Sequence, residues 1–533
     1  MRVLLLSNVN MQPLVGFLKP WEVTCGEYNS ILIDLSVPGS LVDSGDFSHV
    51  LCLFDSDVMM GDAFHGQGSA RQCEVFLCGL EAFCTRYPEK VVVTNSFCFS
   101  SNRWLSFADL LHPASLAAAE TTFNAQLVAL AKAHPNLLLI DLGLLFRRYG
   151  EDSLISPSFW YAGRIRYTNQ MFRALATTIQ QALAAYASRS RKVIVLDLDN
   201  TLWGGIVGEL GPSGIALSED GEGRCYRDFQ RFVKAVQQTG VLLAVCSKNN
   251  LADVEQVFES NSMMILHLED FVSIRVNWQP KTENIMDIAE TLDLGLDSFV
   301  FIDDSPVERE IVTATLPEIA VPTFPDRIED LPSWFIREIV PCYFGRYTIT
   351  AEDGARTKQY QTNGERRRLG KKMDLDTFLT ELQIECTFCV DQAACVARIT
   401  QMTQRTNQFN LTSRRYEIPD INRFIEHPDY AVLALDYRDR FGSEGSVALA
   451  ILDFTQGRID TLLLSCRVIG RKVEDRLLEE AFKLFRMRGI ERVVGEFIPT
   501  RKNQVVATFY EAHGFTPAGE LEGGRKLYER FIA

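Results

Sequence analysis

The feature of this sequence that most restricts its fold is a series of short apolar segments, each followed by polar residues and a helical stretch. In the first part of the chain these segments are VLLLSN (3–8), HVLCLF (49–54), KVVVTNS (90–96) and NLLLIDL (136–142). The helical stretches include residues 116–135 and 172–191. Strands that alternate with helices predict a parallel α/β sheet, because a parallel pair needs a long crossover connection.

A second α/β unit is expected to begin at KVIVLDLDN (192–200) and to continue with strands at 241–248 and 298–305. Amphipathic helices are predicted between and around these strands, at 223–238, 251–259 and 283–292. From about residue 380 the pattern changes to antiparallel strands with one strong helix at 473–489. The predicted fold class is therefore α/β with three domains, at residues 1–188, 189–340 and 381–533, and a charged linker or helix at 341–380.

The charge balance bears on the class of partner. The 54 Lys and Arg against 69 Asp and Glu give a net charge of −15, which argues against nucleic acid as a ligand, because such proteins show a basic face. No apolar run approaches the ~18–20 residues that span a bilayer, so no membrane association is expected. The opening MRVLLLSNVN is too short for a signal-peptide core, and the 13 cysteines are expected to be mostly reduced thiols in a cytoplasmic protein.

Polar side chains follow three of the apolar strands of the second unit. Asp197 and Asp199 stand directly after VIVL, two positions apart, so both side chains reach a common ligand as the chain leaves the strand. Ser247 ends the next strand, and Lys281 begins a helix. Asp303 and Asp304 end the third strand. Burying several carboxylates together is costly without a cation, so the pattern predicts a metal site, with Mg²⁺ as the expected ion.

The order DxDxT, Ser, Lys and DD resembles the haloacid dehalogenase (HAD) superfamily of phosphatases and phosphoryl or acyl transferases. The resemblance implies a HAD-like Rossmannoid parallel sheet in which Asp197 attacks phosphorus and also binds Mg²⁺, and Asp199 is general acid/base. It further implies that Ser247 and Lys281 hold the phosphoryl group. The expected metal ligands are Asp197, Asp199, Asp303 and Asp304. Because the helix at 223 follows soon after the motif, the cap is expected to be minimal, and the pocket is either open to macromolecular substrates or closed by another domain.

Longer strings narrow the resemblance. LDLDNTLWGGIVGELGPSGIAL, FIDDSPVERE, QRTNQFNLTSRRY and SCRVIGRKVED are similar to the FkbH family. The resemblance implies a transferase that loads a glyceryl unit from 1,3-bisphosphoglycerate onto an acyl carrier protein, with phosphate removal, in polyketide or related biosynthesis. In that family a cysteine between the two aspartates carries the acyl group, whereas this chain has Leu198.

The sequence leaves three hypotheses for the function. The first is glyceryl loading without a cysteine at position 198. Cys246, beside Ser247, is one substitute for the missing cysteine, and direct transfer from an acyl phosphate to the carrier thiol is another. The second hypothesis is a Mg²⁺-dependent phosphatase that acts on another small phosphorylated or carrier-bound metabolite. The third is a non-catalytic scaffold for a carrier protein, against which the complete set of HAD residues argues.

The N-terminal domain resembles a degenerate SGNH hydrolase. Ser7 follows the first strand, where that family has its nucleophile, and Asn95 ends a later strand. Arg166 and Tyr167 stand about where the family has its histidine. Because a serine needs a base to deprotonate it, we expect Ser7 to be inert.

The C-terminal domain resembles the GNAT acyltransferase fold, an α+β domain. The resemblance places Arg467, Gly470 and Arg471 in a turn before a helix, where backbone N–H groups can cradle a pyrophosphate. It places Asn503 and Tyr510 in a second cofactor-binding segment, with Tyr510 either protonating a thiolate or packing in the core. The implied ligand is coenzyme A or the phosphopantetheine arm of a carrier protein.

Two further segments have two interpretations each. The charged stretch 351–372 is either a solvated linker helix or a basic docking surface for an acidic carrier protein. The docking surface would consist of Arg366, Arg367, Arg368, Lys371 and Lys372. The amide-rich run 406–410 either caps turns or hydrogen-bonds a polar ligand.

Overall fold

The structure is a computed structural model of the 533-residue chain. It describes residues 1–37, 41–61, 71–101, 105–113, 115–187, 189–354, 356–370, 374–521 and 524–532. No helix within these ranges is both long and apolar enough to cross a bilayer.

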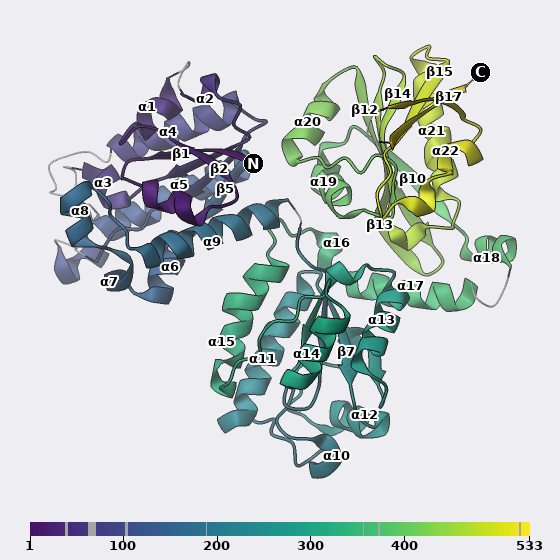
Figure 1. Cartoon of the computed structure of the whole chain (residues 1–533), viewed down its shortest axis with the longest axis horizontal. Coiled ribbons are helices and arrows are strands. Elements are labelled where there is room, and N and C mark those ends of the chain that lie inside the picture. Colours follow the sequence, from purple (N-terminus) through teal and green to yellow (C-terminus); the bar gives the residue numbers. More distant parts are fainter. Residues whose placement is uncertain are drawn as a thin grey trace. The chain divides into compact units, whose positions relative to one another are not determined.

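The chain forms three separate sheets (Figure 1). By internal contacts it divides into two compact units. One unit contains Met1–Leu183 with Ile418–Asp420, and the other contains Ala184–Glu417 with Ile421–Ala533. The second unit therefore holds two of the three sheets.

The N-terminal sheet is parallel and has the order β2-β1-β3-β4-β5. Its strands are β1 (Arg2–Ser7), β2 (Glu22–Cys25), β3 (His49–Leu53), β4 (Val91–Asn95) and β5 (Leu137–Ile140). The main helices of this unit are α1 (Ile31–Ser36), α4 (Arg71–Arg86), α5 (Leu116–Ala133), α6 (Leu142–Tyr149), α8 (Pro157–Gly163) and α9 (Asn169–Tyr186). Strands β3 and β4 are almost wholly buried, as their unbroken apolar runs require when helices cover both faces.

The middle sheet is also parallel, with the order β8-β7-β6-β9. Its strands are β6 (Val193–Leu196), β7 (Leu242–Ser247), β8 (Phe271–Val276) and β9 (Phe299–Ile302). Alternate residues of β6 and β7 pack in two apolar clusters, one shared with α11 (Gly221–Gln238) and α12 (Leu251–Ser260), the other with α13 (Lys281–Leu292) and α14 (Pro306–Thr315). The chain leaves β6 for β7 on one side and reaches β9 on the other, so a crevice opens at the carboxyl end of β6.

The C-terminal sheet is largely antiparallel, with the order β10-β12-β13-β14-β15-β17-β16. Its strands are β10 (Glu385–Val390), β12 (Tyr430–Asp439), β13 (Gly442–Asp453), β14 (Arg458–Leu464), β15 (Arg492–Phe497), β16 (Thr516–Leu521) and β17 (Arg525–Phe531). Helices α19 (Val396–Arg405), α20 (Ile418–Glu426), α21 (Val473–Met487) and α22 (Phe509–Ala512) belong to the same part of the chain. The parallel pair β14–β15 joins at only Arg458↔Val494 and Ile459↔Gly495, so these two strands diverge.

The predicted α/β class with parallel sheets is confirmed. Every strand named from the sequence is present, and the helices match to within a few residues. The strands that were not predicted are β2, β8, β16, β17 and the two-residue strand β11 (Phe409–Asn410). Strand β8 is half-buried and carries Arg275 and Ser273 among its apolar residues, which weakens its pattern in the sequence.

The charged segment before the third sheet is helical, as one of the two interpretations expected, but Arg366 fits neither. It forms α16 (Ala351–Gly354) and α17 (Arg356–Gly370). Arg366 is buried between Asp439 and Glu444, so it does not belong to a solvated face or a docking surface. A buried guanidinium needs such partners, because an isolated charge in the protein interior is expensive. Nothing is described for the side chains of Arg367 and Arg368, and Lys371 and Lys372 lie outside the described residues.

The burial of Arg366 predicts a large effect on stability. Arg366→Met removes charged hydrogen-bond donors from Asp439 and Glu444, which keep Arg471 and Arg467 as partners, and we expect the free energy of unfolding to fall by about 2–3 kcal/mol. Arg440→Met breaks a largely exposed ion pair with Glu381 and is expected to cost at most about 1 kcal/mol. Urea denaturation of both variants measures the difference, and equal losses would show that Arg366 is not structurally buried in solution.

Candidate active site

The site begins where the backbone leaves β6. Asp197 continues the strand, with its N–H donated to Ile302 O at 3.0 Å, and Asn200 then turns the chain with φ +53°. Because side chains alternate along an extended segment, Asp197 and Asp199 face the crevice and Leu198 faces the apolar core. The prediction that both aspartates stand at a strand end is confirmed.

Lys281 brings the carboxylates together. Its Nζ lies 3.0 Å from Asp197 Oδ1 and 2.6 Å from Asp303 Oδ2, and all three side chains are buried. Burial disfavours the lysine's charge, but the two carboxylates outweigh that effect and raise its pKa above the ordinary value. Ser247, at the end of β7, is also buried and receives a hydrogen bond from Asn249 Nδ2 at 3.3 Å.

Three carboxylates form a group of the kind that holds a cation. Oxygen atoms of Asp197, Asp303 and Asp304 lie within 4.8 Å of one another. Burial raises the pKa of Asp197 to about 6, with Lys281 opposing and Asp303 adding to the shift. Burial also raises the pKa values of Asp303 and Asp304. Three carboxylates and one ammonium leave an excess of negative charge, and an all-oxygen donor set suits Mg²⁺.

Asp199 does not belong to that carboxylate group, and its role as a metal ligand stays a prediction. Its Oδ1 accepts hydrogen bonds from Trp203 Nε1 at 2.8 Å and Val207 N at 3.2 Å, and its Oδ2 accepts from Asn249 Nδ2 at 3.0 Å. Three donors therefore fix the orientation of this carboxylate beside Asp197.

Two residues that had no role assigned from the sequence support the site, although Thr201 ends the DxDxT motif. Asn249 links Asp199 to Ser247, and Thr201 Oγ1 accepts a hydrogen bond from Asp304 N at 3.3 Å. Both are buried polar residues two positions after a motif residue, in SKN and DNT. That placement was the available signal, because a polar residue beside a buried strand end needs a partner.

Neither sequence candidate for an acyl-carrying residue is suited to that task. Leu198 is fully buried in an apolar cluster. Cys246 packs in the apolar cluster on the α13 face of the sheet, with Sγ 3.6 Å from Lys281 O. Burial raises the pKa of Cys246 to about 12, so its thiolate is scarce at neutral pH.

In the N-terminal unit, the residues near the expected histidine position bind acids instead. Arg166 pairs with Asp55 at 3.2 Å and with Asp57 at 2.6 Å, and Tyr167 OH donates to Asp55 Oδ2 at 3.0 Å. Ser7 Oγ accepts from Val9 N at 3.2 Å. Asn95 binds the backbone of Phe54 through both its oxygen and its nitrogen. These contacts link the residues at the carboxyl ends of β1, β3 and β4. The inertness of Ser7 stays a prediction.

The residues predicted to hold a cofactor make contacts within the protein. Arg467 pairs with Glu444 at 3.0 Å, and Arg471 donates to Tyr437 OH at 3.2 Å and Asn363 Oδ1 at 2.9 Å. Gly470, with φ +78°, forms the turn between them. The cofactor role of these residues stays a prediction, and both guanidiniums are turned inward.

The chain itself fills the gap between the diverging strands β14 and β15. Strand β11 (Phe409–Asn410) pairs with β14, and Ile498 N donates to Leu411 O at 2.8 Å. Asn503 fastens this insertion by donating to Asn410 O and Ile498 O, each at 2.9 Å. Tyr510 is buried against Gly495, where a Cβ atom would come within 2.2 Å of its ring. Asn503 and Tyr510 therefore serve the core of this sheet.

The amide-rich run has largely the turn-capping role that the sequence allowed. Asn410 Oδ1 accepts from Ser413 N at 2.8 Å, and Asn407 Oδ1 accepts from Arg415 Nη2 at 2.5 Å. Gln408 Nε2 donates to Asp293 Oδ1 at 3.2 Å.

Comparison with solved structures finds a match over much of the chain. The N-terminal part of the protein BF1531 from Bacteroides fragilis, described as containing a phosphatase domain complexed with Mg, is 26% identical with a TM-score of 0.59. The match covers 66% of this chain and 95% of that one. This likeness agrees with the α/β architecture described above.

Two further matches are smaller. The ribosomal-protein-S18-alanine N-acetyltransferase from Escherichia coli is 14% identical with a TM-score of 0.23, covering 28% of this chain and 95% of its own. The GNAT domain of S. lividans PAT is 22% identical with a TM-score of 0.22, covering 28% of this chain and 90% of its own. No family model and no curated protein matches the chain.

The carboxylate geometry predicts which residues bind a divalent cation. Asp304→Asn removes one charge from the group and is expected to weaken Mg²⁺ binding by at least about tenfold. Asp199→Asn, an isosteric change two residues from Asp197, is expected to weaken it less, because its carboxylate is held by Trp203 and Asn249. Calorimetric titration with Mg²⁺ compares the two, and a larger loss in the Asp199 variant would contradict this assignment.

Proposed function

We propose that this protein is a Mg²⁺-dependent phosphatase of the HAD type, with Asp197 as its nucleophile. The observation that carries the proposal is the buried lysine, Lys281, between Asp197 and Asp303, with Asp304 completing an all-carboxylate group. A carboxylate held beside a fixed ammonium suits attack on an anionic phosphate, because the ammonium offsets the repulsion between nucleophile and substrate.

Each residue has a role that its contacts support. Asp197 attacks phosphorus and forms an aspartyl phosphate, while the leaving oxygen takes a proton from Asp199. Asp199 then removes a proton from the water that hydrolyses the aspartyl phosphate. Trp203 and Asn249 hold Asp199 in position for both steps. Ser247 and Lys281 donate hydrogen bonds to the phosphoryl oxygens. When bound by Asp197, Asp303 and Asp304, Mg²⁺ supplies positive charge that offsets the charge of the phosphoryl group.

The comparison with BF1531 supports the same chemistry. Its solved N-terminal part contains a phosphatase domain and was obtained with Mg. At 26% identity over 66% of this chain, the likeness supports a shared reaction class and leaves the substrate to be inferred from the site.

The surroundings of the site favour a substrate whose phosphate group is attached to a macromolecule through a flexible chain. Between β6 and α11, within the fully described range 189–354, the chain contains only the one-turn helix α10 (Val207–Leu210) and short loops. No cap domain of the kind that encloses small substrates is inserted there. This openness favours a metabolite carried by a macromolecule, such as an acyl carrier protein.

The finer proposal is glyceryl loading, which rests on the resemblance to the FkbH family. In this chain the transfer would be direct: the carrier's phosphopantetheine thiolate attacks the acyl carbon of 1,3-bisphosphoglycerate, and the phosphate on that carbon leaves. Hydrolysis of the remaining 3-phosphate through Asp197 then gives the glyceryl thioester. A thioester on the enzyme is disfavoured, because Leu198 replaces the family's cysteine and Cys246 is buried. We propose no binding role for coenzyme A, because β11 occupies the gap between β14 and β15.

Replacing the nucleophile tests the phosphatase proposal. Asp197→Asn keeps the shape of the side chain and removes its nucleophilic oxygen, so Mg²⁺-dependent hydrolysis of a generic phosphate ester should fall by at least about a thousandfold. Glu255→Gln, an exposed change in α12, is the control and should keep full activity. The proposal is overturned if the wild-type protein shows no activity with Mg²⁺, or if Asp197→Asn keeps the activity of the wild type.

Intact-mass spectrometry tests the finer proposal. A phosphopantetheinylated carrier protein, incubated with the enzyme, Mg²⁺ and enzymatically generated 1,3-bisphosphoglycerate, should gain the mass of one glyceryl group. The enzyme should gain no acyl mass. Phosphate release without a gain on the carrier would contradict glyceryl loading and leave the phosphatase with another substrate.

A further inference from the structure

A second polar cavity lies in the same compact unit, apart from the carboxylate site. It has a volume of about 240 Å³. Its walls come from the end of α19, the end of β14, helix α17 and the loop after α13, and none of the proposed catalytic residues lines it. The volume is below the roughly 300–1,000 Å³ of pockets for drug-sized ligands, so it suits a small one.

Basic side chains dominate the lining. They are Lys192, Arg356, Arg398, Arg405, Arg467 and Lys502, against the acidic Asp293 and Asp297. Both acids have partners, since Asp293 accepts a hydrogen bond from Gln408 and Asp297 pairs with Lys502. Lys502 and Arg467 are compensated by Asp297 and Glu444, and the lining still holds more cations than carboxylates in a chain whose net charge is −15.

The charge surplus is greatest around one buried carboxylate, Asp353. Arg346 and Arg356 each lie 2.8 Å from its Oδ1, and Arg405 lies 3.7 Å from the same atom. Three guanidiniums thus share one carboxylate among the described residues. Burial and the charges of Arg356 and Arg346 hold the pKa of Arg405 well below its usual range. Burial and Arg356 also lower the pKa of Arg346 to about 10.

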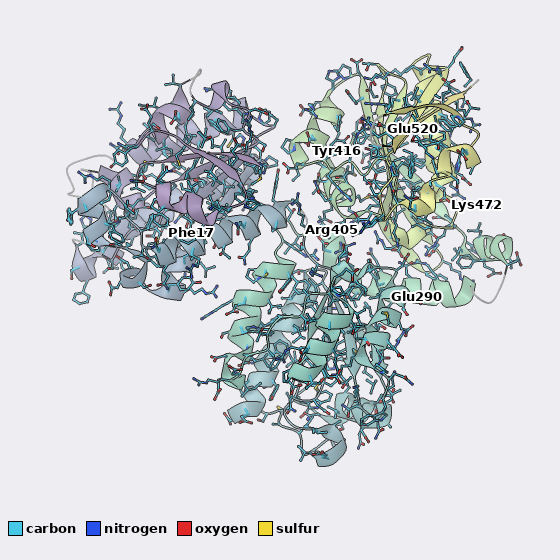
Figure 2. All side chains as sticks on the ribbon, viewed as in Figure 1. Phe17, Glu290, Arg405, Tyr416, Lys472 and Glu520 are labelled. Carbon is cyan, nitrogen blue, oxygen red and sulfur yellow. The ribbon has the colours of Figure 1, made fainter. Side chains whose placement is uncertain are left out.

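Arg405, which is labelled in Figure 2, carries unused donors in this cavity. Its Nε and Nη1 atoms are buried and have no hydrogen-bond acceptor in the described structure. Buried donors without acceptors are rare in proteins and cost free energy. Arg366, whose Nε also lacks an acceptor in the described structure, differs in that its Nη1 and Nη2 atoms pair with two carboxylates.

We propose that this cavity is a binding site for a small phosphate-bearing anion, which supplies the acceptors that Arg405 Nε and Nη1 lack and offsets the positive charge of the lining. Guanidinium forks match phosphate oxygens, and several converging cations favour a di- or polyanion over a single carboxylate. Pyrophosphate and a small phosphate monoester share this chemistry. The inference is independent of the phosphatase activity, since the two sites have no residue in common.

The test uses the full-length protein and sodium pyrophosphate, titrated calorimetrically in the presence of EDTA. Wild type should bind pyrophosphate and show a higher unfolding temperature with it than with sodium sulfate at equal ionic strength. Arg405→Met should bind at least about tenfold more weakly, because it loses the charge-assisted donors of one guanidinium. Arg476→Met, an exposed change in α21 that does not line the cavity, should bind as wild type does. Titration with glycerol 3-phosphate then shows whether a monoester binds in place of pyrophosphate.

A stability readout separates ligand binding from a structural role. Without ligand, Arg405→Met should unfold at no lower temperature than wild type, because Asp353 keeps Arg346 and Arg356 and a buried surplus charge is removed. If Arg405→Met proves insoluble, Arg405→Gln replaces it. Phosphatase activity should be unchanged in either variant. Absence of binding to wild type, equal binding by the Arg405 variant, or a marked loss of its ligand-free stability overturns the proposal.

Discussion

The contact on which the candidate active site depends is the buried lysine, Lys281, between two aspartates. Its ammonium lies 3.0 Å from Asp197 and 2.6 Å from Asp303, away from solvent. Without it, two carboxylates at neighbouring strand ends would repel each other in a medium of low polarity, and protonation would follow. With it, the pKa of Asp197 is about 6, so its carboxylate is mostly ionised at neutral pH. A cation can still bind on the side of Asp304.

The topology makes this contact possible. Asp197 and Asp303 are 106 positions apart, yet β6 and β9 are parallel neighbours, so their carboxyl ends coincide. Lys281 begins α13, the crossover helix that leads to β9, and its position at the helix start brings Nζ to the same edge. The sheet thus brings Asp197 and Asp303 together, and the positive charge of Lys281 lowers the free-energy cost of burying the two carboxylates.

The C-terminal part of the same unit has two clusters of buried arginines and carboxylates. In one, Arg366, Arg467 and Arg471 surround the two carboxylates Asp439 and Glu444. In the other, Arg346, Arg356 and Arg405 surround the single carboxylate Asp353, and two of these three arginines line a cavity. A surplus of cations beside a cavity is a reason to look for a ligand.

The sequence by itself determined the parallel α/β class and most residues of the candidate site, since apolar strands ending in Asp197, Ser247 and Asp303 are local patterns that a sheet brings to one edge. It did not determine which carboxylates come together, because Trp203 and Asn249 hold Asp199 outside the group of Asp197, Asp303 and Asp304, and hydrogen bonds to a side chain have no signature in residue spacing. It also could not show that Arg366 is buried or that β11 fills the gap between β14 and β15. Those outcomes were decided by tertiary structure, because burial and charge compensation depend on partners far away in the chain.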